Sequence, residues 1–337
     1  MQPDFLTTLI NVGMMTALAI PGFLLKKKNM LPEKAVAALV AVLVFVSQPF
    51  ITISGFMEKK YEPALLANMG IALLFSLLFH VIVYFVAKAV FFALTKRADG
   101  DADDETKEKA RVDAWQNKAC TVASFMGNAG FMGLPVMKAL FPDNPEMLIY
   151  TAVINIGFNI ASWTLGVYTI TGNKKDMGLK RALCNPPTLA LVVGLPLFFF
   201  NEYIPLEVFT PVSTAVNYLA DMTLPLSMII LGIRFADLKI KELFSSAKVY
   251  LVCFLKLIVS PLICFALMFV ARLIFPALDA YVIIAVFVIM AMPTAALTLS
   301  FAEMYDGDRL TVVKSTVLST FLSIVTIPLL MLLTVFL

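Results

Sequence analysis

The chain reads GNAGFMGLPVMKALF at positions 127–141, inside an otherwise apolar segment. Glycine and proline interrupt the backbone hydrogen-bond ladder of a helix, so this segment predicts a broken helix. A second interruption, PTAALTLS at positions 293–300, lies inside another apolar segment. In a membrane, lipid cannot satisfy the freed backbone groups, so both breaks must face protein or a water-filled cavity. Matching breaks in the two halves of a chain predict a binding site near the membrane midplane.

The composition is that of a membrane protein. Of the 337 residues, 60% are hydrophobic and 15% are charged, whereas soluble proteins have about 45–50% and about 25%. This balance excludes a soluble globule, a disordered chain and a nucleic-acid-binding protein. The single histidine, His80, excludes a multi-histidine metal site, and the four cysteines show no C-x-x-C spacing. We therefore expect no metal ligands, no cofactor and no nucleic-acid partner.

Ten segments are apolar enough to be membrane spans, each of which needs roughly 20 residues. They cover residues 5–25, 35–57, 63–87, 119–137, 147–173, 182–201, 208–233, 243–271, 280–302 and 315–337. The predicted fold class is therefore an all-α polytopic membrane protein with ten transmembrane helices.

Basic residues are distributed unevenly between the predicted loops. Of the 26 lysines and arginines, 19 fall in odd-numbered loops and three in even-numbered loops, when Lys88, Lys138 and Lys314 are assigned to span ends and Lys248 to a loop. Since cytoplasmic loops carry the excess of basic residues, the odd loops are predicted to be cytoplasmic and both termini non-cytoplasmic. The longest loop, 96–118, is expected to be a solvated cytoplasmic connector.

Ten spans divide into two sets of five. Because five is odd, the second set enters the membrane from the opposite side and forms an inverted repeat. Pro49 and Gly55 in the second span have counterparts in Pro225 and Gly232 of the seventh. We therefore predict one repeat over residues 1–173 and another over 174–337, with broken fourth and ninth helices.

Five short motifs occur in order within these spans. They are the segment 127–141, Asn185-Pro-Pro-Thr188, the segment 221–232, Lys256 with Pro261, and the segment 293–305. Together they resemble the auxin efflux carrier family, which holds plant auxin carriers and bacterial permeases for malonate, malate and related acids. The resemblance covers almost the whole membrane-embedded chain.

The resemblance implies an architecture. Spans 1, 2, 6 and 7 would form a scaffold that dimerises, and spans 3–5 and 8–10 a transport domain. The broken helices would cross at the substrate site, with Asn128 and Pro293 at the crossing. Plant members carry Gln where this chain has Asn159. They also carry an Asp and a Lys in the third span, where this chain offers only uncharged polar residues and His80. A bacterial inner membrane is the expected location.

The predicted substrate site surrounds the two breaks. Its candidate residues are Asn128, Gly127, Gly130, Pro135, Pro293, Thr294 and Asn159. Half-helices that begin at the crossing point unpaired N–H groups and positive dipole ends toward it, so an anion can be held there without arginine. The Asn128 amide either contacts substrate or bonds a freed backbone group. The expected substrate is a small organic anion, a carboxylate such as malonate, malate or an auxin-like acid.

Three titratable residues inside spans have both a functional and a structural interpretation. Asp221 is a proton or Na⁺ site, a gate element or a buried structural carboxylate. Lys256 is a counter-charge for the substrate or for a carboxylate, or it snorkels to the interface. His80 is a proton relay or only a hydrogen-bonded residue of the bundle. Since Asp221 and Lys256 have opposite signs, we expect them to be electrostatically linked.

These features favour a secondary active transporter in the lipid bilayer, with H⁺ or Na⁺ as the coupling ion. The chain has no G-x-x-x-x-G-K-[ST] nucleotide loop, which excludes a primary pump within it. It offers no nucleophile–histidine or paired-aspartate motif, so we expect no catalytic residues and no enzyme. An anion channel and a non-transporting membrane receptor or scaffold are the alternatives.

Overall fold

The computed structural model describes residues 5–32, 34–95, 103–236, 243–244 and 246–337. Over these residues the secondary structure is helical, apart from one isolated β-bridge. Within them, eight segments are long and apolar enough to cross a membrane: Phe5–Lys27, Ala35–Glu58, Pro63–Leu94, Glu146–Thr171, Lys174–Tyr203, Leu206–Ala236, Ala247–Ile274 and Arg309–Phe336. Two shorter apolar helices, Ala129–Leu140 and Ala280–Met290, lie at the predicted fourth and ninth spans.

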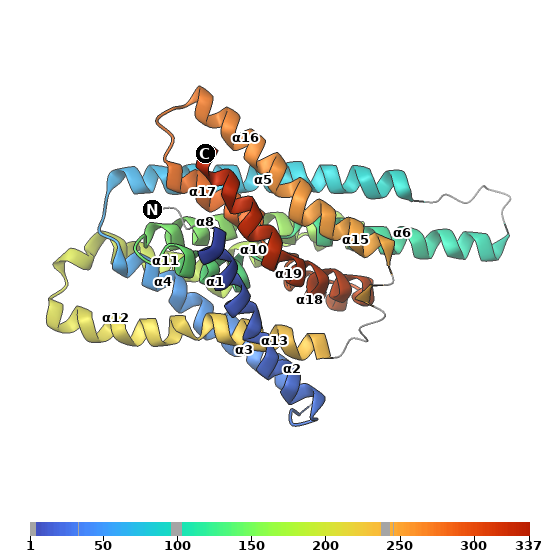
Figure 1. Cartoon of the computed structure of the whole chain (residues 1–337), viewed down its shortest axis with the longest axis horizontal. Coiled ribbons are helices and arrows are strands. Elements are labelled where there is room, and N and C mark those ends of the chain that lie inside the picture. The colour runs from blue at the N-terminus through green and yellow to red at the C-terminus, as the bar shows by residue number, and fades with distance from the viewer. Residues whose placement is uncertain (1–4, 33, 96–102, 237–242, 245) are drawn as a thin grey trace.

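The helices of the first half are often continued by short π-helical turns (Figure 1). They are α1 (Phe5–Ala17), α2 (Ala19–Lys27), α3 (Ala35–Val42), η1 (Leu43–Ser47), α4 (Gln48–Glu58), α5 (Pro63–Leu94), α6 (Asp104–Phe125), η2 (Ala129–Gly133), α7 (Leu134–Leu140), α8 (Glu146–Ala161), η3 (Ser162–Gly166) and α9 (Val167–Thr171). The break between α6 and η2 falls on the glycine-rich segment, as the sequence predicts.

The second half begins with a 3₁₀ turn, η4 (Lys174–Asp176). Its other elements are α10 (Leu179–Leu183), α11 (Pro186–Phe200), η5 (Asn201–Tyr203), α12 (Leu206–Asp221), α13 (Thr223–Ala236), α15 (Ala247–Phe254), η6 (Leu255–Val259), α16 (Ser260–Ile274), α17 (Ala280–Met290), α18 (Leu297–Met304), α19 (Arg309–Met331) and η7 (Leu332–Phe336). The break between α17 and α18 contains Pro293, which has no N–H to donate to a helix.

We distinguish two sets of closely packed helices, which also contact each other through α4 and α8, while α1 packs on α19. In one, α2 lies against α13, and α4 lies against α11 and α12. In the other, α5 packs on α6 and α8, α8 on α17, and α19 on α6 and α15. The α2 and α13 backbones approach so closely that a Cβ on Gly22 would collide with the Ile229 carbonyl, and one on Gly232 with the Ala19 carbonyl. Such close approach between small residues is typical of membrane helix pairs.

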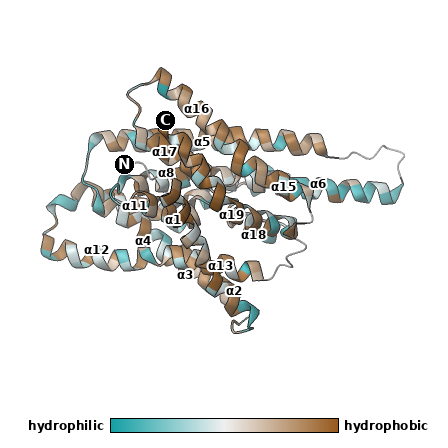
Figure 2. Cartoon of the chain, viewed as in Figure 1, coloured by the Kyte–Doolittle hydropathy of each residue, from teal (hydrophilic) through white to brown (hydrophobic). Residues whose placement is uncertain are grey.

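The most buried helices lie at the centre of the molecule. Residues Val282 to Met290 of α17 are all buried, and α8 is buried along most of its length. The outer helices instead expose large apolar side chains, such as Phe45, Leu74 and Phe92. Figure 2 shows this apolar covering over most of the helical body, with polar residues gathered at loops and on α6. An apolar exterior of this kind suits a protein surrounded by lipid.

The expected connector 96–118 is exposed at residues 103–109, and it is helical from Asp104 onward. Residues 96–102 lie outside the described residues, and α6 begins at Asp104. Asp103 caps this helix, because its carboxylate accepts a hydrogen bond from the Thr106 amide at 3.1 Å. Hydrogen bonding from Thr106 also lowers the pKa of Asp103. A polar composition suggested a loop, but a cap and i,i+4 ion pairing allow a polar helix to extend beyond the apolar region.

Candidate functional site

The two broken helices meet at a backbone crossing. The Asn128 amide donates to the Pro293 carbonyl at 2.8 Å, and the Ala295 amide donates to the Met126 carbonyl at 2.9 Å. These bonds flank an isolated antiparallel bridge. Helices α6 and α17 end just before the crossing, and η2 and α18 begin just after it. Each break therefore satisfies backbone groups that the other break frees, which lipid could not do.

A cavity of about 190 Å³ lies beside the crossing, and we call it the amide cavity. Its polar lining consists mainly of side-chain amides, those of Gln48, Asn128, Asn155, Asn159 and Asn185. The first turns of η2 and α18 contribute to the wall through Gly130 and Leu297. The N-terminal ends of two half-helices therefore meet at this cavity, where their N–H groups favour an anion.

The side-chain amides of the cavity differ in whether they already form hydrogen bonds within the protein. Asn159 donates from its side chain to the Asn155 carbonyl at 2.9 Å. Asn185 caps α11, with its side-chain oxygen accepting from the Thr188 amide at 3.0 Å. By contrast, no residue in the described ranges hydrogen-bonds to the side-chain amides of Gln48, Asn128 and Asn155. These three are the amides most available to a ligand.

The backbone around the cavity is shaped to keep it open. A Cβ on Gly130 would lie 2.8 Å from Nε2 of Gln48 and 3.5 Å from Oδ1 of Asn155. The π-helical turn η1 immediately precedes Gln48, η2 contains Gly130, and η3 contains Trp163 of the cavity wall. Turns of this kind are rare and occur mostly at functional sites.

Several predicted site residues support the crossing rather than line the amide cavity. Thr294 is buried, and its hydroxyl donates to the Ala123 carbonyl at 2.9 Å. Pro135 is buried in the first turn of α7. Gly127 lies against Lys256, because a Cβ there would be 2.9 Å from Nζ of the lysine. These residues hold the crossing together and do not contact the cavity.

Lys256 and His80 are both buried within the bundle. The Lys256 ammonium donates to the Met290 carbonyl at 3.1 Å, at the C-terminal end of α17. A cation is favourable there because it opposes the negative end of the helix dipole. His80 Nδ1 donates to the Ser76 carbonyl at 2.7 Å, and its ring lies 5.8 Å from Phe158, which lines the amide cavity. Neither Lys256 nor His80 lines the amide cavity itself.

Asp221 differs from its prediction. It is the last residue of α12, its side chain is 62% exposed, and it forms an ion pair with Lys138 at 2.8 Å. Lys256 instead bonds to a backbone carbonyl. The expected link between Asp221 and Lys256 is therefore not a direct pair in this conformation. Lys138 reaches Asp221 from α7 and supplies its counter-charge.

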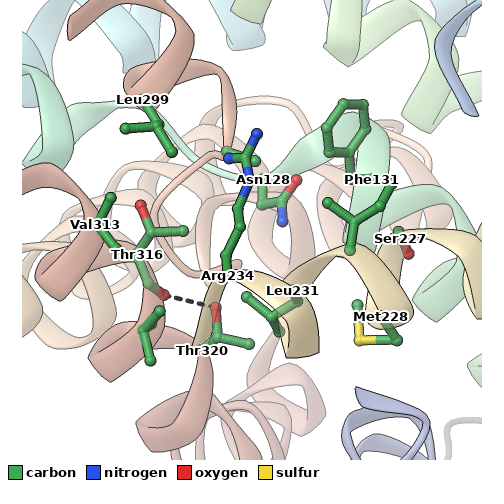
Figure 3. A pocket seen from close by; sticks show the side chains of 13 residues that line it. Asn128, Phe131, Ser227, Met228, Leu231, Arg234, Leu299, Val313, Thr316 and Thr320 are labelled. Atoms are coloured by element: carbon green, nitrogen blue, oxygen red, sulfur yellow. Dashed lines mark hydrogen bonds between the residues drawn. The ribbon is translucent and has the colours of Figure 1, made fainter. Parts of the chain in front are cut away.

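A smaller cavity of about 30 Å³ shares Asn128 and Phe131 with the amide cavity as lining residues, and we call it the arginine cavity (Figure 3). Helix α13 contributes Arg234 to its wall, and α19 contributes Thr316 and Thr320. The Nη1 atom of Arg234 is buried and has no hydrogen-bond partner within the part of the chain that the structure describes. Asn128 thus lies between two cavities of different chemistry.

Sequence reasoning missed Gln48, Asn155 and Arg234. Gln48 is a polar residue next to Pro49 in an apolar span, and Asn155 precedes Asn159 by one helical turn. A polar residue beside a proline in an apolar span, and an amide one helical turn from a predicted site residue, are the signals that could have identified them. Arg234 was counted as a loop residue because it lies near the end of its span, and only the structure shows that residues of α13, α18 and α19 line one cavity with it.

Known proteins match this chain along most of its length. The family described as "Membrane transport protein" matches residues 173–331. An uncharacterized transporter of Methanocaldococcus jannaschii is 24% identical over 321 residues, which cover 93% of this chain and 94% of that protein. An uncharacterized transporter of Methanothermobacter thermautotrophicus is 30% identical over 221 residues, which cover 65% of this chain and 68% of that protein.

The helical fold, the apolar spans and these relatives define a multi-pass membrane transport protein and not an enzyme. The chain belongs to the membrane transport protein family of the auxin efflux carriers.

Proposed function

We propose that the protein is a secondary active transporter that moves a small organic anion by alternating access. The observation that carries this proposal is the crossing of two broken helices beside a cavity lined by free amides. Helix N-termini and amide N–H groups can replace the hydration shell of a carboxylate. The amide cavity has room for a small organic acid, which makes malonate, malate and auxin-like acids the first candidates.

A ten-span inverted repeat accounts for the arrangement of the loops. The two short apolar helices at the breaks, added to the eight longer segments, would give ten spans. Two ion pairs support this count, because each of the two joins connections of the same predicted parity. Lys248 of the seventh-to-eighth connection pairs with Asp113 of the third-to-fourth at 2.6 Å. Lys60 of the second-to-third connection pairs with Glu202 of the sixth-to-seventh at 2.9 Å.

In this proposal the two packing groups move relative to each other. Helices of spans 1, 2, 6 and 7 form a scaffold, and those of spans 3–5 and 8–10 form a transport domain that carries the crossing. Repeat one would cover residues 1–173 and repeat two 174–337, with both termini on the non-cytoplasmic side of a bacterial inner membrane. The exposed apolar side chains of α12, including Leu206 and Val212, suit a homodimer contact through the scaffold.

The proposal is tested by uptake into proteoliposomes. Radiolabelled malonate, malate and indole-3-acetate are offered with an imposed pH gradient, an imposed Na⁺ gradient or neither. Accumulation above equilibrium with one of the gradients identifies both the anion and the coupling ion, H⁺ or Na⁺. Uncoupled, current-carrying flux would instead indicate a channel, and binding without uptake a receptor; either result contradicts the proposal.

A further inference from the structure

We propose that Arg234 is the cationic anchor of the transported anion, and that its guanidinium binds a carboxylate in the arginine cavity. The inference deepens the proposed function and rests on it, since it names the residue that recognises the anion's charge. The amide cavity supplies hydrogen bonds without a full positive charge in its lining. Arg234 supplies that charge in the arginine cavity, which shares Asn128 with the amide cavity.

The environment of Arg234 leaves a donor without a partner. Its Nη1 atom is buried, and no described residue accepts a hydrogen bond from it. A buried N–H of a charged group is unfavourable unless it is paired, so the empty site is the less stable state. A carboxylate entering the cavity would satisfy this donor and neutralise the charge.

No acidic side chain from the described residues lines the arginine cavity and competes for the guanidinium. Among the described residues, Glu303 is the acidic group whose field acts on Arg234. Glu303 is itself paired with Arg309 at 2.9 Å. Arg234 therefore keeps its charge available to an anion from outside the protein.

The geometry suits one end of a carboxylate-bearing molecule. In Figure 3 the Arg234 side chain extends from α13 toward Asn128 and Leu299, so that the guanidinium and the Asn128 amide face the same region. The planar fork of arginine can bind both oxygens of one carboxylate. A volume of about 30 Å³ admits a group of that size and not a whole organic acid. The rest of the molecule would occupy the amide cavity, which shares Asn128 and Phe131 as walls.

An anion held in this way would join the two packing groups. Arg234 is carried by α13, which packs on α2, whereas Asn128 belongs to the crossing. A carboxylate bound to both residues would bridge the groups, and their separation would release it. Binding at Arg234 would thus be coupled to the conformational change.

The test measures anion binding separately from transport. The melting temperature of the purified protein is followed against malonate and against its neutral analogue malonamide, at constant ionic strength. We compare wild type, Arg234→Gln, Arg234→Lys and the control Arg272→Gln, whose arginine is exposed near the end of α16. Malonate uptake into proteoliposomes is measured for the same proteins.

Malonate, and not malonamide, should stabilise wild type and Arg272→Gln, and Arg234→Gln should lose this shift. Arg234→Lys keeps the charge without the fork, so its half-maximal shift should need at least about threefold more malonate. If Arg234→Gln does not fold, Arg234→Lys decides alone, and wild-type behaviour of that variant overturns the inference. Absence of a malonate shift in wild type, or an unchanged shift in Arg234→Gln, also overturns it.

The two assays separate the anchor from the proposed function. An arginine-dependent shift without uptake would refute the proposed transport and leave the anchor standing. Uptake with an unchanged half-saturation in Arg234→Gln would refute the anchor and leave the proposed transport standing.

Discussion

Replacing Gly130 by alanine should narrow the amide cavity without disturbing the core. The new Cβ would lie 2.8 Å from Nε2 of Gln48 and 3.5 Å from Oδ1 of Asn155. The Gln48 amide is the far end of a flexible side chain and can move away. Alanine also favours helical backbone by about 1 kcal/mol over glycine, so we expect little change in melting temperature. The methyl group and the displaced amide should raise the half-saturation concentration for uptake about tenfold, which is about 1.4 kcal/mol.

Gly133→Ala provides the matched control in the same half-helix. Its Cβ would lie 2.6 Å from Cδ1 of Ile289, a buried residue of α17. Overpacking of this kind costs about 1–3 kcal/mol, so this variant should melt earlier and keep a normal half-saturation. Both variants are compared by differential scanning fluorimetry and proteoliposome uptake. The reasoning is refuted if Gly130→Ala transports with wild-type half-saturation, or if the two variants lose stability and affinity alike.

Three further predictions concern the buried lysine, the surface pair and the topology. Lys256→Met should raise the melting temperature, because the ammonium is fully buried and a backbone carbonyl is its one partner among the described residues. The same variant should lower uptake at least about tenfold, and a less stable variant with normal uptake would contradict this. Lys138 and Asp221 should show a coupling of about 0.5 kcal/mol in a double-mutant cycle of thermal stability, since both side chains are partly exposed; a coupling above about 2 kcal/mol would show that the pair is shielded from water. A reporter fused after Leu337 that works only in the cytoplasm should stay silent, and an active fusion would rule out ten spans.

Much of the fold was predictable because the determining signals are local in the sequence. Long apolar segments identify the spans, and glycine and proline at 127–141 and 293–300 identify the breaks. The helical start of α6 was missed, because its polar composition hides a helix that is stabilised by the Asp103 cap. Apolar composition identifies a segment that is buried in lipid, but polar composition does not show whether a segment in water is helical.

The candidate site was only partly predictable, because its partners come from distant segments. The breaks and the resemblance placed Asn128 and Pro293 at the crossing, but Gln48 and Asn155 reach the amide cavity from other helices through tertiary packing. The Asp221–Lys138 pair joins residues 83 positions apart, and no periodicity within one helix reveals it. Arg234 lies near the end of its span, where arginines commonly reach the interface, so the burial of its Nη1 atom required the structure.

The central claim is that the anion binds at the crossing through Asn128, and the most direct test is the affinity of Asn128→Ala. The Asn128 backbone forms the crossing, whereas its side-chain amide has no hydrogen-bond partner among the described residues and lines both cavities. Alanine should therefore leave folding intact and remove a ligand contact. Binding of the transported carboxylate, measured by isothermal titration calorimetry, should weaken at least about tenfold in Asn128→Ala and be unchanged in the loop control Asn144→Ala. Equal affinity in wild type and Asn128→Ala, with both proteins folded, would contradict the account.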